Sequence, residues 1–209
     1  MKIYDWRLAP NPKRLRMFLV EKNIDIPIEE VAGDDLRLRP DYIARYPQAM
    51  VPMLELDDGT QIGESMAICR FLEELQPEPR LMGVDAKDRA IVEMWERRAF
   101  DEGMMAAGEV FRNTADAFVD RGVPGAAVAV VQIPELAERG RQRLDLFFDK
   151  FDRQLAKHRY VAGDRFSIAD CTTFCSIEFA SWSDIPSPER CTNLRRWHAE
   201  VSARPSATA

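Results

Sequence analysis

Apolar and polar positions in the first third of the chain alternate between a strand-like and a helical spacing. Residues 2–6 and 24–31 are short runs rich in β-branched and aromatic side chains, which predicts two strands. A helix between them is predicted to begin at Asn11-Pro12, because asparagine is a favourable N-cap and proline suits the first helical position. The inward side of the second strand is expected to carry Ile26, Ile28 and Val31.

A short helix, a hairpin and a longer helix are predicted next. Residues 40–46 form the short helix, which Pro47 ends. Residues 53–56 and 60–62 pair through a turn at Asp58-Gly59. The longer helix begins at Glu64, and its apolar stripe has helical spacing. That stripe consists of Ile68, Phe71, Leu72 and Leu75.

The remaining two thirds of the chain have helical spacing throughout. Two prolines in residues 76–79 indicate a linker, which divides the chain into residues 1–76, a linker at 77–85 and residues 86–209. Helices are predicted over 86–118, around an apolar stripe from Leu144 to Leu155, and from Ser167 and Thr192 onward. The fold class is therefore α/β in the first domain and all-α in the second.

Composition and charge narrow the function classes. The 209 residues carry a net charge of −6 with lysine and arginine dispersed along the chain, so neither a nucleic-acid footprint nor a polybasic membrane patch is present. No apolar run is long enough for a membrane span, and the first residues do not resemble a signal peptide. Four cysteines in a chain of this length fit a reduced, cytoplasmic protein.

Four motifs in order along the chain resemble the glutathione transferase family. Residues 51–54, 58–59 and 64–68 resemble its VPxL, DG and ESxAI pattern. Residues 9–16, Ala-Pro-Asn-Pro-Lys-Arg-Leu-Arg, resemble the APNPRRVR segment of some bacterial members, residues 163–170 its capping motif, and residues 197–207 its C-terminal helix. The resemblance implies a thioredoxin-like N-terminal domain that binds glutathione and an all-helical C-terminal domain.

The resemblance implies that Glu64 and Ser65 hold the γ-glutamyl group of glutathione. A helix N-terminus attracts a carboxylate, the Ser65 hydroxyl adds a donor there, and Glu64 offers a negative charge to the ammonium group. The alternative is that one of the two side chains merely caps the helix. Pro52 corresponds to the family's cis-proline, which leaves the main chain of Val51 free to pair with the cysteinyl residue; the alternative is an ordinary proline beginning a strand.

The group that activates the glutathione thiol is the open question. Ala9 stands at the position where many members have a catalytic serine, and it has no hydroxyl. Lowering a thiol pKa from about 8.5 to about 6.5 requires about 2.7 kcal/mol, which one charge-assisted hydrogen bond nearly supplies. Asn11 is the candidate donor, as in some bacterial members; its alternative role is that of a helix cap. Tyr4 lies too early in the chain.

A further departure from the family pattern concerns the glycyl end of the ligand. Met50 replaces the polar residue that contacts the glycyl carboxylate, so that contact is expected from Arg37, Arg39 or Gln48, or is missing.

The apolar pocket for the second substrate is expected between the two domains. Its proposed walls are Arg7, Leu8, Ala9, Met104, Met105 and Phe111.

Other features of the sequence are interpreted as structural. Ser167 and Asp170 have capping-box spacing, and Cys171 and Cys175 are expected in the core rather than at a metal, so no metal site is predicted. The family forms dimers through the helix that contains residues 95–102, so a homodimer is expected, with a solvated charged surface as the alternative.

Two functions remain open from the sequence. The first is an enzyme that activates glutathione and transfers it to a small hydrophobic electrophile or reduces a peroxide, as in detoxification. The second is a non-catalytic binding or interaction protein of the same fold, which Ala9 and Met50 favour and the intact residues Val51, Pro52, Glu64 and Ser65 oppose.

Overall fold

The strands near the N-terminus form one mixed sheet. The computed structural model describes residues 1–31, 40–126 and 128–209. The strand order is β2 (Ile28–Glu30), β1 (Lys2–Asp5), β3 (Met53–Glu55) and β4 (Gln61–Ile62), with β1 parallel to β2 and antiparallel to β3. Ile3 pairs with both Ile28 and Leu54, which places β1 at the centre of the sheet.

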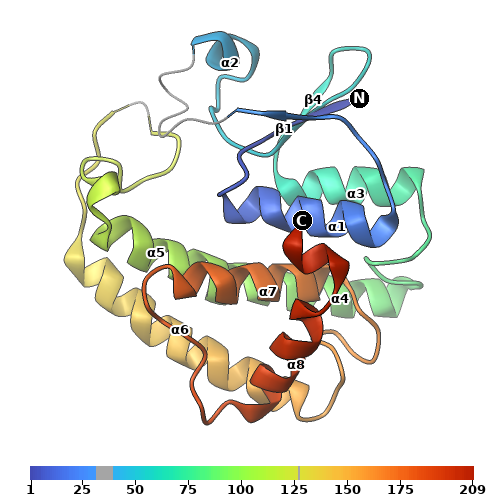
Figure 1. Ribbon diagram of the computed structural model, residues 1–209, viewed down its shortest axis with the longest axis vertical. Coiled ribbons are helices and arrows are strands. Elements are labelled where there is room, and N and C mark those ends of the chain that lie inside the picture. Colours follow the sequence, from blue (N-terminus) through green and yellow to red (C-terminus); the bar gives the residue numbers. More distant parts are fainter. Residues whose placement is uncertain (32–39, 127) are drawn as a thin grey trace.

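Side chains along β1 alternate between the two faces of the sheet, and different helices pack against each face. Ile3 points toward α1 (Pro10–Lys22) and α3 (Ser65–Leu75), which lie side by side beneath the sheet in Figure 1. Tyr4 points to the opposite face, where its ring lies 5.8 Å from that of Tyr42 in α2 (Pro40–Arg45). The hairpin of β3 and β4 is confirmed, and Gly59 adopts the positive φ of 85° that its turn requires.

Helices make up the rest of the described chain. They are α4 (Ala86–Arg98), α5 (Met105–Thr114), α6 (Pro134–Leu155), α7 (Ile168–Ser181) and α8 (Thr192–Ser202), with 3-10 turns at Asp116–Phe118 and Pro205–Thr208. A π-helical segment, Ala99–Met104, joins α4 to α5. The helical stretch predicted over 86–118 therefore runs from Ala86 to Thr114 with an irregular middle, and it ends four residues earlier than predicted. At Gly103 in this segment a Cβ atom would lie 2.8 Å from the Phe147 ring, so only glycine permits the approach of α6.

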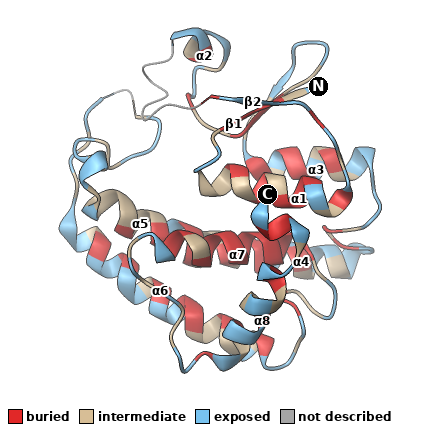
Figure 2. Ribbon diagram, in the orientation of Figure 1, coloured by how far each residue is buried: buried red, intermediate tan, exposed pale blue. Residues whose placement is uncertain are grey.

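The central helix of this part is α7, whose side chains are almost all buried (Figure 2). Its start is fixed by Asp170, which is fully buried and accepts hydrogen bonds from Val161 N, Ser167 N and Trp197 Nε1 at 2.8–2.9 Å. The predicted capping box between Ser167 and Asp170 is confirmed. Cys171 and Cys175 lie in the core, as expected.

The end of the described chain returns to α1 (Figure 1). Arg204 donates to both carboxylate oxygens of Glu21, at 2.7 and 2.6 Å.

Two predictions of buried side chains were wrong. Ile28 and Leu75 are about half exposed, because β2 is an edge strand and Leu75 is the last residue of α3. Among the described residues, no helix is long and apolar enough to cross a membrane.

Candidate functional site

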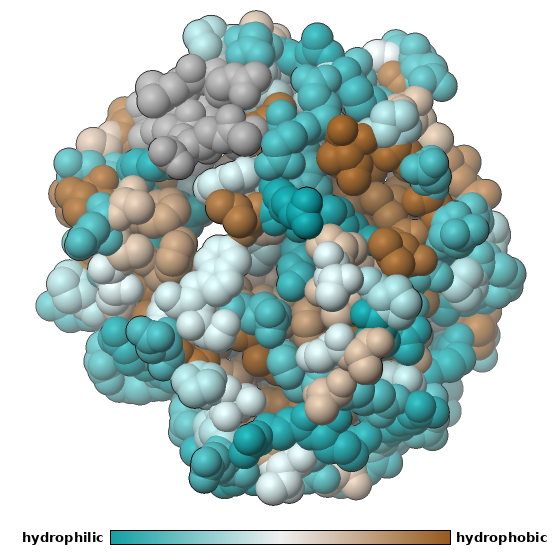
Figure 3. Space-filling model, viewed as in Figure 1, coloured by the Kyte–Doolittle hydropathy of each residue, from teal (hydrophilic) through white to brown (hydrophobic). Residues whose placement is uncertain are grey.

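A cavity of about 440 Å³ opens where the sheet-containing part meets the helices. Ala9 and Asn11 from the start of α1, and Val51 before β3, form one wall. Met104 and Met105, at the start of α5, contribute to the opposite wall. Figure 3 shows the surface hollowed between these two parts, to the left of the view. The cavity has the size and the mainly apolar lining of a small-molecule site.

The first turn of α1 differs from the prediction in one respect. The helix begins at Pro10 and its N-cap is Ala9, so the expectation that Asn11 caps the helix was wrong. Pro10 fits the first helical position as well as Pro12 does, and the helix uses the earlier of the two prolines. Because both prolines lack an N–H, Asn11 is the one residue among the first three of α1 with a main-chain donor.

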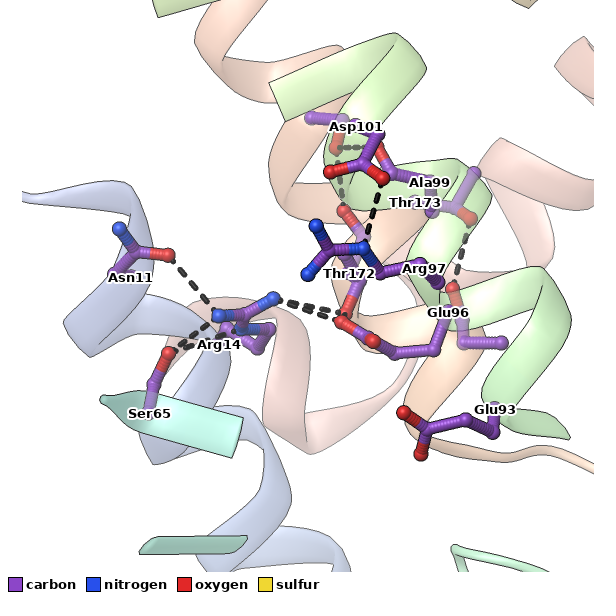
Figure 4. A network of polar contacts seen from close by, with 12 residues as sticks. Asn11, Arg14, Ser65, Glu93, Glu96, Arg97, Ala99, Asp101, Thr172 and Thr173 are labelled. Atoms are coloured by element: carbon purple, nitrogen blue, oxygen red, sulfur yellow. Dashed lines mark hydrogen bonds and ion pairs between the residues drawn. The ribbon is translucent and has the colours of Figure 1, made fainter. Parts of the chain in front are cut away.

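Arg14 is the functional residue that the sequence analysis missed. It is only 3% exposed, and its guanidinium lies between Asn11 and Ser65 on one side and Glu96 and Thr172 on the other (Figure 4). Its Nε donates to Ser65 Oγ at 3.2 Å, and its Nη2 donates to Ser65 Oγ and to Asn11 Oδ1, the latter at 3.1 Å. Its Nη1 donates to Glu96 Oε1 at 3.0 Å and to Thr172 Oγ1 at 3.4 Å. All five N–H donors of the guanidinium are therefore used.

This arrangement fixes the direction of two hydrogen-bond donors. A guanidinium has no acceptor, so the oxygen of the Asn11 amide must face Arg14 and its NH2 group points away (Figure 4). Likewise, both lone pairs of Ser65 Oγ receive N–H groups of Arg14, which leaves the hydroxyl hydrogen free to donate elsewhere. Neither donor has an acceptor among the residues that the structure describes. Arg14 thus orients Asn11 and Ser65 so that their remaining donors point away from the guanidinium.

Glu96 balances the buried charge of Arg14. The alternative that the charged residues of the 95–102 segment form a solvated surface is wrong for Glu96, which is only 3% exposed. Burial raises the pKa of Glu96, while Arg14 and the hydroxyl of Thr172 act in the opposite direction. The ion pair joins α1 to α4 and, through Thr172, to α7, so it fixes the start of α1 against the helical part.

The segments expected to hold glutathione have an unusual backbone. The Val51-Pro52 peptide bond is cis, as expected. Within the described residues, the N–H and C=O of Val51 make no hydrogen bond to the protein. Glu64 precedes α3 with φ at 61° and ψ at 111°, a strained conformation for a residue with a side chain, and its side chain makes no capping hydrogen bond. The simple helix-cap alternative for Glu64 is therefore wrong.

The structure brings some of the predicted site residues together and separates others. Ala9, Asn11, Val51, Met104 and Met105 line the cavity. Ser65 adjoins them through Arg14, and Glu64 follows directly before Ser65. The residues predicted as walls that lie outside the lining are Arg7, Leu8 and Phe111.

The candidates for the glycyl contact differ in where they lie. Arg37 and Arg39 lie outside the described residues, and Gln48 is exposed, with its carbonyl oxygen beside Gly125. Within the residues that the structure describes, no group of three or more His, Cys, Asp or Glu side chains is placed to hold a metal ion.

A sequence signal for Arg14 was present. Arg14 lies one turn after Pro10 and one turn before Phe18, on the face of α1 that Leu15 and Phe18 bury. An arginine on an apolar face is rarely buried without partners, so it predicts a buried carboxylate or hydroxyl elsewhere in the chain. That signal says nothing of where the partner lies.

Comparison with known proteins agrees with this geometry. Residues 9–75 match the family model for the N-terminal domain of glutathione S-transferase, and residues 113–205 match the model for its C-terminal domain. The chain is 32% identical to Glutathione S-transferase 2 of Saccharomyces cerevisiae, an alignment that covers 99% of this chain and 87% of that protein.

Solved structures give the same result. A glutathione S-transferase domain-containing protein of Marinobacter aquaeolei is 33% identical, with a TM-score of 0.90 and 99% of both chains covered. Gtt2 of Saccharomyces cerevisiae is 32% identical, with a TM-score of 0.88 over 99% of this chain and 98% of that one. The cis bond before Pro52, the sheet with its flanking helices and these matches together establish that the chain belongs to the glutathione S-transferase family.

Proposed function

We propose that the protein is an enzyme that binds glutathione, stabilises its thiolate through Asn11 and transfers the sulfur to a small apolar electrophile. The observation that carries this proposal is the orientation of the Asn11 amide, whose NH2 group Arg14 directs away from itself at the wall of the cavity. The main-chain N–H of Asn11, at the start of α1, adds a second donor beside it. Among the described residues that line the cavity, none carries a hydroxyl that could replace the serine absent at Ala9, and Tyr4 is buried and bonded to Glu55 and Arg45.

The proposed ligand position follows from the free polar groups. The γ-glutamyl carboxylate lies at the N-terminus of α3, where the first N–H groups have no helical partner and the Ser65 hydroxyl is available. Glu64 faces the ammonium group. The free main-chain groups of Val51 pair with the cysteinyl residue, which places the thiol beside Asn11 at the cavity wall.

The reaction needs only a thiolate and a good leaving group. The thiolate attacks the electrophilic carbon, a carbon–sulfur bond forms, and the leaving group departs with the electron pair of its own bond. Peroxide reduction is the second branch of the proposal. The methionine and phenylalanine side chains of the cavity wall favour the apolar electrophile, because they form an apolar surface for its body.

The test measures glutathione binding by calorimetry and the conjugation of chlorodinitrobenzene by absorbance. We expect Asn11→Ala to lower kcat/KM by about 10- to 100-fold and to move the pH–rate profile to higher pH, because the thiol pKa rises when its donor is lost. Gln142→Ala, which removes an amide from the exposed surface of α6, serves as the control. Ala9→Ser should preserve or increase turnover.

A non-catalytic role is the competing proposal. Glutathione binding with no turnover of electrophile or peroxide, unaltered by Asn11→Ala, would support it against the enzyme. Failure to bind glutathione would contradict both functions.

The setting of the protein is also a proposal. We propose a cytoplasmic homodimer that handles reactive apolar compounds. Four buried, unpaired thiols support a reducing compartment, and half-exposed Met94 on α4 supports an apolar contact with a second copy. Light scattering coupled to size exclusion gives the mass in solution; a mass of one chain at micromolar concentration would contradict the dimer.

A further inference from the structure

Arg112 lines the apolar cavity and has no carboxylate partner among the residues that the structure describes. Met105, Gly108 and Arg112 follow each other at helical spacing along α5, and all three line the cavity. The Arg112 guanidinium lies 4.8 Å from the centroid of the Phe118 ring, which is also part of the wall. Its one hydrogen bond within the described chain runs from Nη1 to the carbonyl oxygen of Arg121, at 3.4 Å. Four of its five N–H donors are therefore available.

Within the described part of the chain, no neighbouring carboxylate forms an ion pair with Arg112. Glu109, one turn earlier on α5, binds Arg143 at 2.7 Å and Arg139 at 3.4 Å instead. Arg121 also lines the cavity, and its guanidinium lies 5.2 Å from the Phe118 centroid. The Phe118 ring thus contacts two guanidinium groups, while most of the cavity wall is apolar.

The surroundings of Arg112 lower the pKa of its guanidinium. Burial lowers the pKa of Arg112 to about 10, and Arg121 adds to the effect. The group still carries its charge near neutral pH. A desolvated, charged guanidinium with unused donors gains more from an anion than an exposed one does, because water screens the interaction less.

We propose that Arg112 is the anchor of an anion subsite, and that the second substrate is an apolar electrophile that also carries a carboxylate. This inference rests on the proposed function, which supplies the thiolate at the other wall of the same cavity. The apolar walls take the body of the substrate, and Arg112 pairs with its carboxylate. The anchor thereby orients the electrophilic carbon with respect to Asn11 and the bound sulfur.

The test compares a chlorodinitrobenzoate with its methyl ester, which differ in charge but share the reactive ring. Binding of each to the full-length protein is measured by calorimetry without glutathione, and turnover of each is measured with glutathione. We expect the acid to bind about tenfold or more tightly than the ester. Arg112→Gln should abolish this preference by weakening the acid alone, and Arg112→Lys should retain part of it.

The matched control is Arg141→Gln on α6, which removes the same charge from a side chain that is 46% exposed and does not line the cavity. It should leave the preference intact. Equal binding of acid and ester by the wild type, or equal weakening of both by Arg112→Gln, would overturn the anion subsite. A protein that prefers the acid but converts neither compound would support the subsite and contradict the proposed enzyme activity, so the two failures are distinguishable.

Discussion

The Nη2 atom of Arg14 lies 3.1 Å from the Oδ1 atom of Asn11. This contact is one of five hydrogen bonds that the Arg14 guanidinium donates. The same group reaches Glu96 from the other side of the interface. A residue that contacts no predicted ligand thus sets the orientation of two residues proposed to contact one. Its structural role and its positioning role are separable by experiment.

Arg14→Met should lower the free energy of unfolding by about 3–5 kcal/mol, because it leaves Glu96 buried without its partner. The double variant Arg14→Met, Glu96→Leu should recover most of that loss, since it removes the uncompensated charge. Turnover should stay low in both, because the Asn11 amide is free to rotate. Denaturant titration and conjugation assays check these outcomes; full activity in the double variant would show that Arg14 is only structural.

Ser65→Ala should raise the KM for glutathione about tenfold and leave kcat close to that of the wild type. The hydroxyl is proposed to bind the γ-glutamyl carboxylate, far from the sulfur, so its loss weakens binding of glutathione in the ground state and the transition state alike. Ser202→Ala, at an exposed serine of α8, is the control. A drop in kcat with an unchanged KM would assign Ser65 to the chemistry instead.

Asp170 should make the stability of the protein depend on pH. Burial raises the pKa of its carboxyl from 3.8 to about 6, against the opposing effect of its hydrogen-bond donors. Between these values the folded state binds a proton that the unfolded state has released. The contribution of Asp170 is therefore fully present below pH 3.8 and is lost as the pH rises through about 6, a change of about 3 kcal/mol.

Unfolding experiments on the wild type and Asp170→Asn at several pH values isolate this contribution, because asparagine does not titrate. The difference in unfolding free energy between the two should shrink as the pH rises from about 4 to about 7. A difference that is constant over this range would contradict the prediction.

The four cysteines should be unreactive in the folded protein. Burial raises the pKa of Cys69 and Cys175 to about 12 and that of Cys191 to about 11, and it raises that of Cys171 well above its ordinary value. Since the thiolate is the reactive form, an aromatic disulfide reagent at pH 8 should modify no thiol quickly and all four after unfolding. Rapid release of one equivalent from the folded protein would identify an exposed thiolate.

The predictable parts of this protein are those that depend on neighbouring residues. The hairpin at Asp58-Gly59, the capping box at Ser167 and the cis bond before Pro52 each follow from a few adjacent positions, whether read from turn and cap chemistry or from the family pattern. The start of α1 was predicted two residues too late, at Pro12 instead of Pro10. Both prolines suit the first helical position, and helix-capping preferences do not decide between them.

The contacts of Arg14 were not predictable in the same way. Glu96 and Thr172 lie 82 and 158 positions further along the chain, and no spacing rule connects positions so far apart. The charged neighbours of Glu96 in sequence suggested a dimer contact or a solvated surface, whereas its side chain is turned into the core of the protomer. Arg112 shows the same limit: its place in the cavity depends on how α5 meets the start of α1.

The ion pair between Arg14 and Glu96 also has a consequence for synthesis on the ribosome. Glu96 and Thr172 are translated 82 and 158 residues after Arg14, so neither partner is present when α1 is first made. The nascent N-terminal portion therefore holds an unneutralised cation at its future interface until α4 and α7 dock. The orientation of Asn11 that we propose for thiol activation therefore depends on contacts that form only after α4 and α7 are made.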